Sequence, residues 1–496
     1  MRKKTHLTAL AALLLIIVSA SSCSKKQLDI NSPNPNQPSE VSPDLILPAA
    51  LVSTANQVFG GDANFLNFWM GYWAPYGEQS PAVLSYNLTT DTYAPNWDHT
   101  YVTLENYKIV ADNSSIPARA YFLAISKIME VFHYQRLVDL YNNIPYSEAL
   151  QPTNAFPKFD SAAAVYKQLV VQLDSAALII ANANASTTDN PAAADVLFQG
   201  DMTKWIKFDH TLKLKILMRQ TELPGGPAYI ASSLAGLTAS DFLGEGEDAG
   251  INPGYSNATA AQQSPLYRNI GYNPDGSPTG GYLFIRANSF AVNFYLNTND
   301  PRVGQFYAVN ANGIYKGRAF GSSDVGQGGN NTSGFGLGLL NSGSAPAFIL
   351  PAFESLFLQA EAAERGYISG DAVALFKSAV TESFRILSVP DFANAAQAYY
   401  SQASDKVNIG TSGNKINTII TQKWAAMNGF DPLESYSDWR RLNIPPDLPV
   451  SVYPGTTSSH IPYRLLYPSS EYSYNASHVS TQGTINQFTS KVFWMP

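Results

Sequence analysis

The chain has 496 residues, a formal net charge of −7 at neutral pH and a single cysteine. The acidic balance excludes nucleic acid as an expected partner, and a single cysteine excludes a framework of internal disulfides. Only 14% of the residues are charged, against about 25% in typical proteins, while tyrosine occurs 28 times. Such a surface suits neutral ligands that carry hydroxyl groups, or alternatively an extensive protein interface.

Residues 1–22 are predicted to be a cleaved lipoprotein signal peptide. Basic residues at positions 2–4 precede an apolar run over 7–20, and small residues then lead into Cys23. The run is shorter than the roughly 20 residues that span a bilayer. We expect Cys23 to become the lipid-bearing N-terminus, with acyl chains such as palmitate anchoring the protein to a membrane. The alternative is an ordinary signal peptide with a chance cysteine near its end.

The segment 23–43 is predicted to be a tether, because it is rich in proline, asparagine and serine. The remainder, 44–496, is predicted to be a single domain. Its regular patterns are interrupted by long irregular stretches at about 61–100, 222–350 and 443–490. The first two stretches are predicted to carry the ligand-binding regions, since long loops in a folded domain usually have a function or are disordered.

The clearest regular pattern in the first half is helical. Apolar residues recur at three- and four-residue steps over 118–141, which predicts one apolar face of a long helix. A second helix with the same period follows Asp160, and a third follows Asp201. Both aspartates are of the residue type that begins helices.

The pattern returns in the second half as a compact pair of helices. One helix stops at Gly366, the next opens after Asp371, and a further helix covers about 413–429. The pair is close to the 34-residue length of a tetratricopeptide repeat. The sequence therefore predicts an all-α fold in which tetratricopeptide-like helix pairs form a scaffold for long irregular loop insertions.

Motifs for catalysis and metal binding are not found in the sequence. It has no nucleophile elbow, no phosphate-binding P-loop and no His-Glu-x-x-His, and its histidines lack metal-ligand spacing. We therefore expect no catalytic residues and no cofactor. Glycoside hydrolysis by two carboxylates remains an alternative, because their separation is a property of the fold. The pair Glu361 and Glu364 is expected to be exposed or to cap a helix.

One acidic cluster is the only candidate for a structural metal. It could bind Ca²⁺ through carboxylate oxygens, or it could form a solvated turn. It comprises Asp241, Glu245, Glu247 and Asp248.

The aromatic residues of the first irregular stretch are the candidate ligand contacts. Flat aromatic faces stack on the apolar faces of sugar rings, while nearby amides and hydroxyls satisfy the ring hydroxyls. Trp97 is expected at a loop tip. Trp69 and Trp73 have an alternative, since their four-residue spacing also fits the buried stripe of a short helix. The predicted ligand-binding residues are Trp69, Trp73, Tyr76 and Trp97.

Six stretches, in this order along the chain, together resemble the SusD/RagB-like nutrient-binding outer-membrane lipoproteins. They are LDINSPNPNQPSE (28–40), DLYNNIPYSEAL (139–150), GDMTKWIKFDHTLKLKILMR (200–219), FESLFLQAEAAERGYISGDA (353–372), QKWAAMNGFDPLESYSDWRR (422–441) and YRLLYPSSEYSYN (463–475).

The resemblance implies a SusD-like fold and a non-catalytic protein of the outer membrane. Such a protein faces the cell exterior, captures a glycan or other nutrient, and delivers it to a SusC-like TonB-dependent transporter. Two alternatives come from other functional classes. One is a glycoside hydrolase, and the other is a subunit whose main role is structural or gating at the transporter.

Overall fold

The computed structural model describes residues 41–76 and 81–496. The signal peptide, Cys23 and nearly all of the predicted tether lie outside the described residues. Pro43–Pro496 form one unit, and the fold is described for this unit by itself.

The three helices expected in the first half are present, and their caps explain where they start. They are α6 (Ala120–Tyr141), α7 (Ala162–Asn182) and α8 (Met202–Met218). The side chain of Ser161 accepts a hydrogen bond from a backbone N–H in the first turn of α7, and Asp201 accepts two in α8. These side chains satisfy donors that a helix start leaves free.

The helix pair expected in the second half is also present. It consists of α14 (Ala352–Glu364) and α15 (Ala372–Ile386), followed by α16 (Phe392–Tyr400) and α17 (Lys415–Ala426). Gly366 has a φ of +75°, a conformation that glycine adopts without strain, and this lets the chain leave α14. Asp371 then caps α15 through the N–H groups of Val373 and Ala374.

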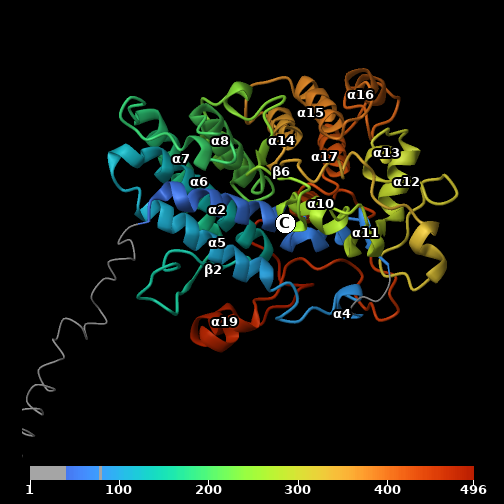
Figure 1. Ribbon diagram of the computed structural model, residues 1–496, viewed down its shortest axis with the longest axis horizontal. Helices are drawn as coiled ribbons and strands as arrows, with labels where there is room; N and C mark the ends of the chain where they lie inside the picture. Colours follow the sequence, from blue (N-terminus) through green and yellow to red (C-terminus); the bar gives the residue numbers. More distant parts are fainter. Residues whose placement is uncertain (1–40, 77–80) are drawn as a thin grey trace, which may run out of the picture. The chain divides into compact units, whose positions relative to one another are not determined.

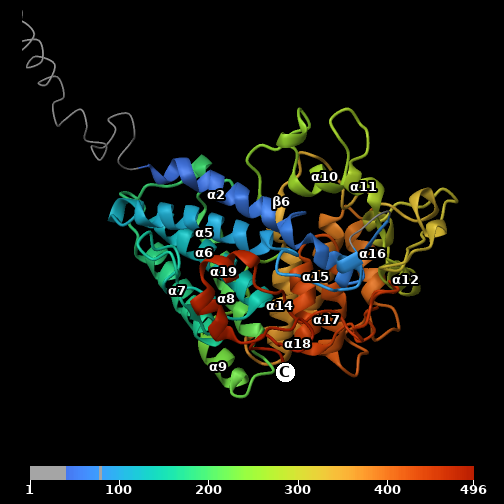
Figure 2. The same ribbon diagram turned by 90° about the horizontal axis from the view of Figure 1, so that it is seen from below.

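Two more long helices complete the scaffold, α2 (Pro43–Val58) and α5 (Pro95–Asp112). Successive helices pack side by side: α2 on α5, α5 on α6, α6 on α7, α7 on α8, α8 on α14, α14 on α15, and α17 on α14 (Figures 1 and 2). The all-α prediction is therefore confirmed. The tetratricopeptide likeness of the pairs stays a prediction.

The stretches predicted to be irregular contain short helices as well as loops. Most of these helices have fewer than ten residues, too few for a helical period to stand out in the sequence. They are α3 (Leu66–Trp69), α4 (Pro81–Leu84), α9 (Gly226–Ser233), α10 (Pro265–Ile270), α11 (Gly280–Phe284), α12 (Ser289–Asn297), α13 (Val303–Phe306), α19 (Ser469–Tyr474) and α20 (Ala476–Val479). A further helix, α18 (Pro432–Leu442), follows α17 outside these stretches.

Residues 41–76 and 81–496 contain three small antiparallel strand pairs, two of which join distant parts of the chain. β1 (Trp73–Pro75) pairs with β5 (Ile285–Ala287), β2 (Ile144–Pro145) with β3 (Phe159–Asp160), and β4 (Ala249–Ile251) with β6 (Ala347–Leu350). The β1–β5 pair fixes the aromatic-rich segment against the second loop-rich region.

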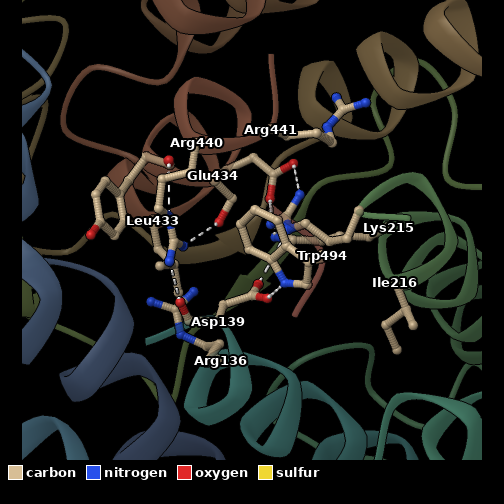
Figure 3. Close-up of polar contacts among 12 residues, drawn as sticks. Arg136, Asp139, Lys215, Ile216, Leu433, Glu434, Arg440, Arg441 and Trp494 are labelled. Carbon is tan, nitrogen blue, oxygen red and sulfur yellow. Dashed lines mark hydrogen bonds and ion pairs between the residues drawn. The ribbon is translucent and has the colours of Figure 1, made fainter. Parts of the chain in front are cut away.

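A buried charge cluster lies where α6, α8, α14, α17 and α18 meet. Figure 3 shows the part of it that α6, α8 and α18 contribute. In the cluster, Arg219 lies 3.2 Å from Asp139, Lys215 lies 2.7 Å from Glu354, and Arg441 lies 2.6 Å from Glu361. Cations and anions balance, as burial of charge requires. The cluster comprises Arg136, Lys215, Arg219, Lys423, Arg440 and Arg441 with Asp139, Glu354, Glu361, Asp431, Glu434 and Asp438.

The expectation for Glu361 was wrong. Its side chain is fully buried and pairs with Arg441 and Arg365. The spacing of acidic residues within one helix does not show which cations from other helices pack against them. Here α18 supplies Arg441, which pairs with Glu361. Glu364 is partly exposed and lies 3.1 Å from Lys415.

Neighbouring charges give the buried carboxyls different pKa values. Burial alone would raise the pKa of Glu434, but Arg219, Lys215 and Lys423 outweigh it and hold that pKa well below its ordinary value. For Glu354 burial prevails over the attraction of Lys215 and raises the pKa to about 7.

The raised pKa of Glu354 predicts that the contribution of this residue to stability grows at mildly acidic pH. Between pH 7 and about 4.5 the folded protein holds a proton on Glu354 that the unfolded chain releases, and this adds at most about 1.4 kcal/mol per pH unit as the pH falls. Buried His133 acts in the opposite direction below about pH 6.5, because burial lowers its pKa to about 3 and only the unfolded chain takes up that proton. At lower pH the unfolded chain also takes up a proton that Glu434 does not bind in the folded protein, and stability is lost. Thermal unfolding of the wild type and of Glu354→Gln from pH 8 to pH 3 isolates the contribution of Glu354. The stability difference between the two proteins is expected to grow as the pH falls from 7 to about 4.5, and the variant is expected to keep the loss at lower pH.

Candidate functional site

A groove of about 600 Å³ lies between α12, the start of α17 and two loops. Its size is within the range of about 300–1,000 Å³ that small-molecule sites occupy. We call it the asparagine groove. Its helical walls are lined by Phe290, Asn293, Phe294, Asn297, Asn414, Asn417, Thr418 and Thr421.

The first wall is one face of α12. The side chain of Asn288 caps this helix by accepting a hydrogen bond from the N–H of Phe290. Residues three, four and seven positions apart share a helix face, so Phe290, Asn293 and Asn297 line the groove together. Both asparagines are exposed, and the phenyl ring of Phe290 is half-buried.

The second wall is the start of α17. Asn414 caps this helix by accepting from the N–H of Asn417, and the side-chain oxygen of Asn417 accepts from Thr421. Both asparagines therefore use their side-chain oxygens within the wall. Their amide NH₂ groups are left as donors for a ligand.

The lining combines apolar rings with neutral polar groups. Phe290 and Phe294 supply flat apolar surface, and the asparagines and threonines supply donors and acceptors that carry no charge. Loop residues complete the groove, and they include Asp405, Lys406 and Asp447. This chemistry fits a ligand with both apolar ring faces and many hydroxyl groups, as a sugar has.

The aromatic-rich segment supports the groove from behind. Phe290 and Phe294 pack edge-on against Trp424, with ring centroids 5.4 and 5.1 Å apart. Trp424 stacks on Tyr72 at 5.2 Å and donates a hydrogen bond to the carbonyl of Met70. The segment that was expected to contact ligand thus positions the residues that line the groove.

Trp69 and Trp73 lie in the core. Trp69 is 1% exposed and packs edge-on against Phe65, and Trp73 is fully buried and donates to the side-chain oxygen of Asn428 at 2.9 Å. They do not form the stripe of a single helix, since Trp69 ends α3 and Trp73 begins β1. Neither ring offers an open face to a ligand in this structure, and their role in binding stays a prediction.

Trp97 does not lie at a loop tip. Pro95 begins α5, which places Trp97 in its first turn, 3% exposed and packed against Tyr141 and Tyr467. The flanking polar residues that indicated a loop instead belong to a helix start, where proline is favoured. Its edge lines a second cavity of about 340 Å³, together with Tyr101.

We predict that Trp97→Phe lowers stability more than it affects any ligand. The change removes ring volume from the core and the indole N–H that hydrogen-bonds Glu471, at a cost of about 1–3 kcal/mol. Denaturant unfolding measures the loss. A variant as stable as the wild type that binds glycan more weakly would instead place Trp97 in the binding site.

Tyr76 is the predicted site residue with the most accessible side chain. It is half-buried, and the guanidinium of Arg318 lies 5.4 Å from the centre of its ring. It is not among the residues that line the asparagine groove. The predicted contacts therefore do not come together at one site.

The acidic cluster has its carboxylates engaged separately. Asp241 accepts from Thr238, Glu247 lies 2.8 Å from Lys207, and Asp248 pairs with Arg385. In the part of the chain that the structure describes, no three side chains of metal-binding type converge on one point. Calcium binding here stays a prediction.

The groove residues could have been found from two sequence patterns. In SFAVNFYLN, asparagines recur at four-residue spacing beside phenylalanines with the same spacing, and NKINTIITQ places polar residues three and four positions apart. Both patterns predict a polar stripe on a helix. What the sequence does not show is that α12 and α17 lie side by side.

The fold is thus a helical scaffold with a ligand-sized groove lined mainly by apolar rings and uncharged polar groups. Residues 35–468 match the SusD-like family described as "Starch-binding associating with outer membrane". The chain belongs to this family.

Solved structures show the same fold. A SusD homolog from Bacteroides fragilis superposes with a TM-score of 0.74 at 19% identity, with 92% of this chain and 99% of that one covered. A chitin-binding SusD homolog from Flavobacterium johnsoniae gives 0.72 at 22% identity, with 90% and 98% covered. A further chitin-binding protein gives 0.72 at 24% identity, with 91% and 100% covered. No curated protein matches the sequence.

Proposed function

We propose that this protein captures an oligosaccharide nutrient at the outer face of the outer membrane and delivers it, uncleaved, to a SusC-like TonB-dependent transporter. The family description supports a carbohydrate ligand and an outer-membrane location. The sequence around Cys23 supports a lipid anchor, and the tether behind it would let the folded domain move relative to the transporter while it stays at the membrane.

The asparagine groove is the observation that carries the proposal. Ring stacking contributes about 0.5–1.5 kcal/mol for each aromatic residue beyond the area buried, and each hydrogen bond adds about as much. Two phenyl rings with several amides would bind a short oligosaccharide in about the micromolar to millimolar range. Affinity of that order allows release to a transporter.

One observation favours the alternative of a glycoside hydrolase. The second cavity is lined by Trp97, Asp98 and Glu471, and burial raises the pKa of both carboxyls, as catalytic acids require. Glu471, however, accepts a hydrogen bond from Asn475 and another from Trp97, which hold it in the cavity wall. These contacts fit a structural role at least as well.

Binding and cleavage are separated by one experiment. The protein without residues 1–22 is titrated with chitin and starch oligosaccharides, the ligand classes printed for its family and its structural relatives. The mixtures are then incubated and the sugars are analysed by chain length. The proposal predicts saturable binding with intact oligosaccharides. Shortened chains in excess over protein, lost in Glu471→Gln, would establish hydrolysis instead.

A further inference from the structure

Two buried arginines lie together beside Tyr76. The N–H of Tyr76 donates to the carbonyl of Phe284, which continues the β1–β5 pairing and brings Tyr76 next to Arg286. The backbone of Arg318 lies beside β5, because its N–H donates to the carbonyl of Ala287, and its guanidinium lies 5.4 Å from the centre of the Tyr76 ring. The phenol of Tyr76 acts electrostatically on both guanidinium groups.

These two arginines have no carboxylate partner among residues 41–76 and 81–496. Arg286 is 6% exposed and Arg318 is 4% exposed, and the Nε atom of each is buried without a hydrogen bond. Most other buried cations of the described residues have a carboxylate partner, as Arg302 has in Asp300 at 2.6 Å. Arg440 and Arg464 are the exceptions, and each lies over an aromatic ring. An unpaired buried charge is costly, so such a pair is expected where an anion binds.

Hydrogen bonds to backbone carbonyls stabilise the positive charges of Arg286 and Arg318 only in part. Arg286 donates to the carbonyl of Leu283 at 3.1 Å, and Arg318 donates to the carbonyls of Gln327 and Ser322. Burial lowers the pKa of both guanidinium groups, which shows that these contacts do not replace the lost water. Asp324 acts on Arg318 through space, but its oxygens accept from Gly326 and from the side chain of Gln327.

Arg440 shows how the protein otherwise holds an arginine that lacks a salt bridge. Its guanidinium lies 3.9 Å from the ring centre of Tyr436 and 4.7 Å from that of Trp494, and it donates to the carbonyls of Asp139 and Tyr463. It therefore has two aromatic faces beside the buried charge cluster. Arg286 has no aromatic ring stacked on it among the described residues, and Arg318 has only that of Tyr76.

Exposed apolar side chains belong to the segments that hold the two arginines. Leu283, Phe284 and Val325 are 44%, 50% and 82% exposed. Gly334 leaves room at the guanidinium of Arg286, since a Cβ atom there would lie 3.0 Å from Nη1 and 3.5 Å from the hydroxyl of Tyr282. A ligand on this surface would meet an apolar rim around cationic donors.

We propose that Arg286 and Arg318 form an anion subsite, which binds a carboxylate or sulfate group on an acidic oligosaccharide. The inference rests on the proposed function, because the remainder of the ligand is the glycan proposed there. It narrows the ligand to oligosaccharides that carry an acidic group. Guanidinium groups suit this role because they present several donors in a fixed plane to carboxylate or sulfate oxygens.

Nuclear magnetic resonance of arginine side chains labelled with ¹⁵N at Nε tests the subsite directly. The protein without residues 1–22 is titrated with glucuronate, with sulfate and with uncharged glucose. We expect the Nε–H signals of Arg286 and Arg318 to shift with at least one of the anions and not with glucose. Glucuronate alone would identify a carboxylate and sulfate alone a sulfate ester. Signals that neither anion moves, or that glucose moves equally, would overturn the proposal.

Variants separate this subsite from the asparagine groove. Arg286→Gln is expected to weaken anion binding about tenfold or more. Since a buried arginine contributes to folding, Gly334→Ala is a second variant, which crowds Nη1 and leaves the guanidinium in place. Asn293→Ala with Asn297→Ala is expected to leave the response to anions unchanged. If the proposed function fails, this double variant loses no glycan affinity. If only the present inference fails, glycan binding persists with no response to anions.

Discussion

The Glu434→Gln variant is expected to lose about 3–5 kcal/mol of unfolding free energy. Glu434 is fully buried and accepts a hydrogen bond from Arg219 at 3.0 Å, and it also pairs with Lys215 at 3.1 Å and with Lys423. Glutamine keeps the shape and removes the charge, so three buried cations would face one another without their shared anion. Urea unfolding at pH 7 measures the loss.

The matched control is an exposed glutamate in a single ion pair. Glu148 lies 3.0 Å from Lys158, and both side chains are more than a third exposed. Water screens this pair, so Glu148→Gln is expected to unfold at the wild-type midpoint. If Glu434→Gln lost no more than this control, the buried charge cluster would not be what holds the helices together.

The second large effect is expected at the asparagine groove. Replacing Asn293 and Asn297 together by alanine removes two amides from one wall, and we expect glycan affinity to fall about tenfold or more. Both side chains are exposed, so folding should be unaffected. Calorimetric titration with a bound oligosaccharide gives the affinity, and thermal unfolding verifies the fold.

A control of the same chemistry lies outside the groove. Asn182 and Asn312 are exposed and are not among the lining residues. Their double replacement by alanine is expected to leave the affinity unchanged. Equal losses in the two double variants would mean that the effect is not specific to the groove.

The scaffold was predictable because its helices are long and amphipathic. Capping residues such as Asp201 and Asp371 marked the helix starts to within a residue. Helices below ten residues were missed, and so were the longer α2, α5 and α18. The start of α5 was not recognised because Pro95 and the polar residues around Trp97 are equally typical of a turn.

The buried charge cluster joins four of the stretches that carry the sequence resemblance. All of its members except Arg136 come from four of the stretches that resemble the family, which span 139–150, 200–219, 353–372 and 422–441. The charged residues of those stretches are far apart in the sequence, yet buried charges of one stretch pair with charges of another. Periodicity alone assigned them to helices and could not show that they meet.

The candidate site was less predictable for a related reason. Aromatic composition predicted ligand contacts in one segment, but Trp69 and Trp73 of this segment lie in the core and Tyr72 supports the groove through Trp424. Composition indicates which residues are suited to sugar stacking, and only packing determines which of them solvent reaches. The groove itself depends on α12 and α17 meeting from positions more than one hundred residues apart.

A glycan array probed in parallel with two proteins tests the central claim most directly. One is the protein without residues 1–22, and the other is the same chain with Asn293→Ala and Asn297→Ala. The account predicts that the first retains at least one class of oligosaccharide and that the second loses most of that signal. Equal retention of the same glycans by both proteins, or no glycan retained by the first, would contradict it.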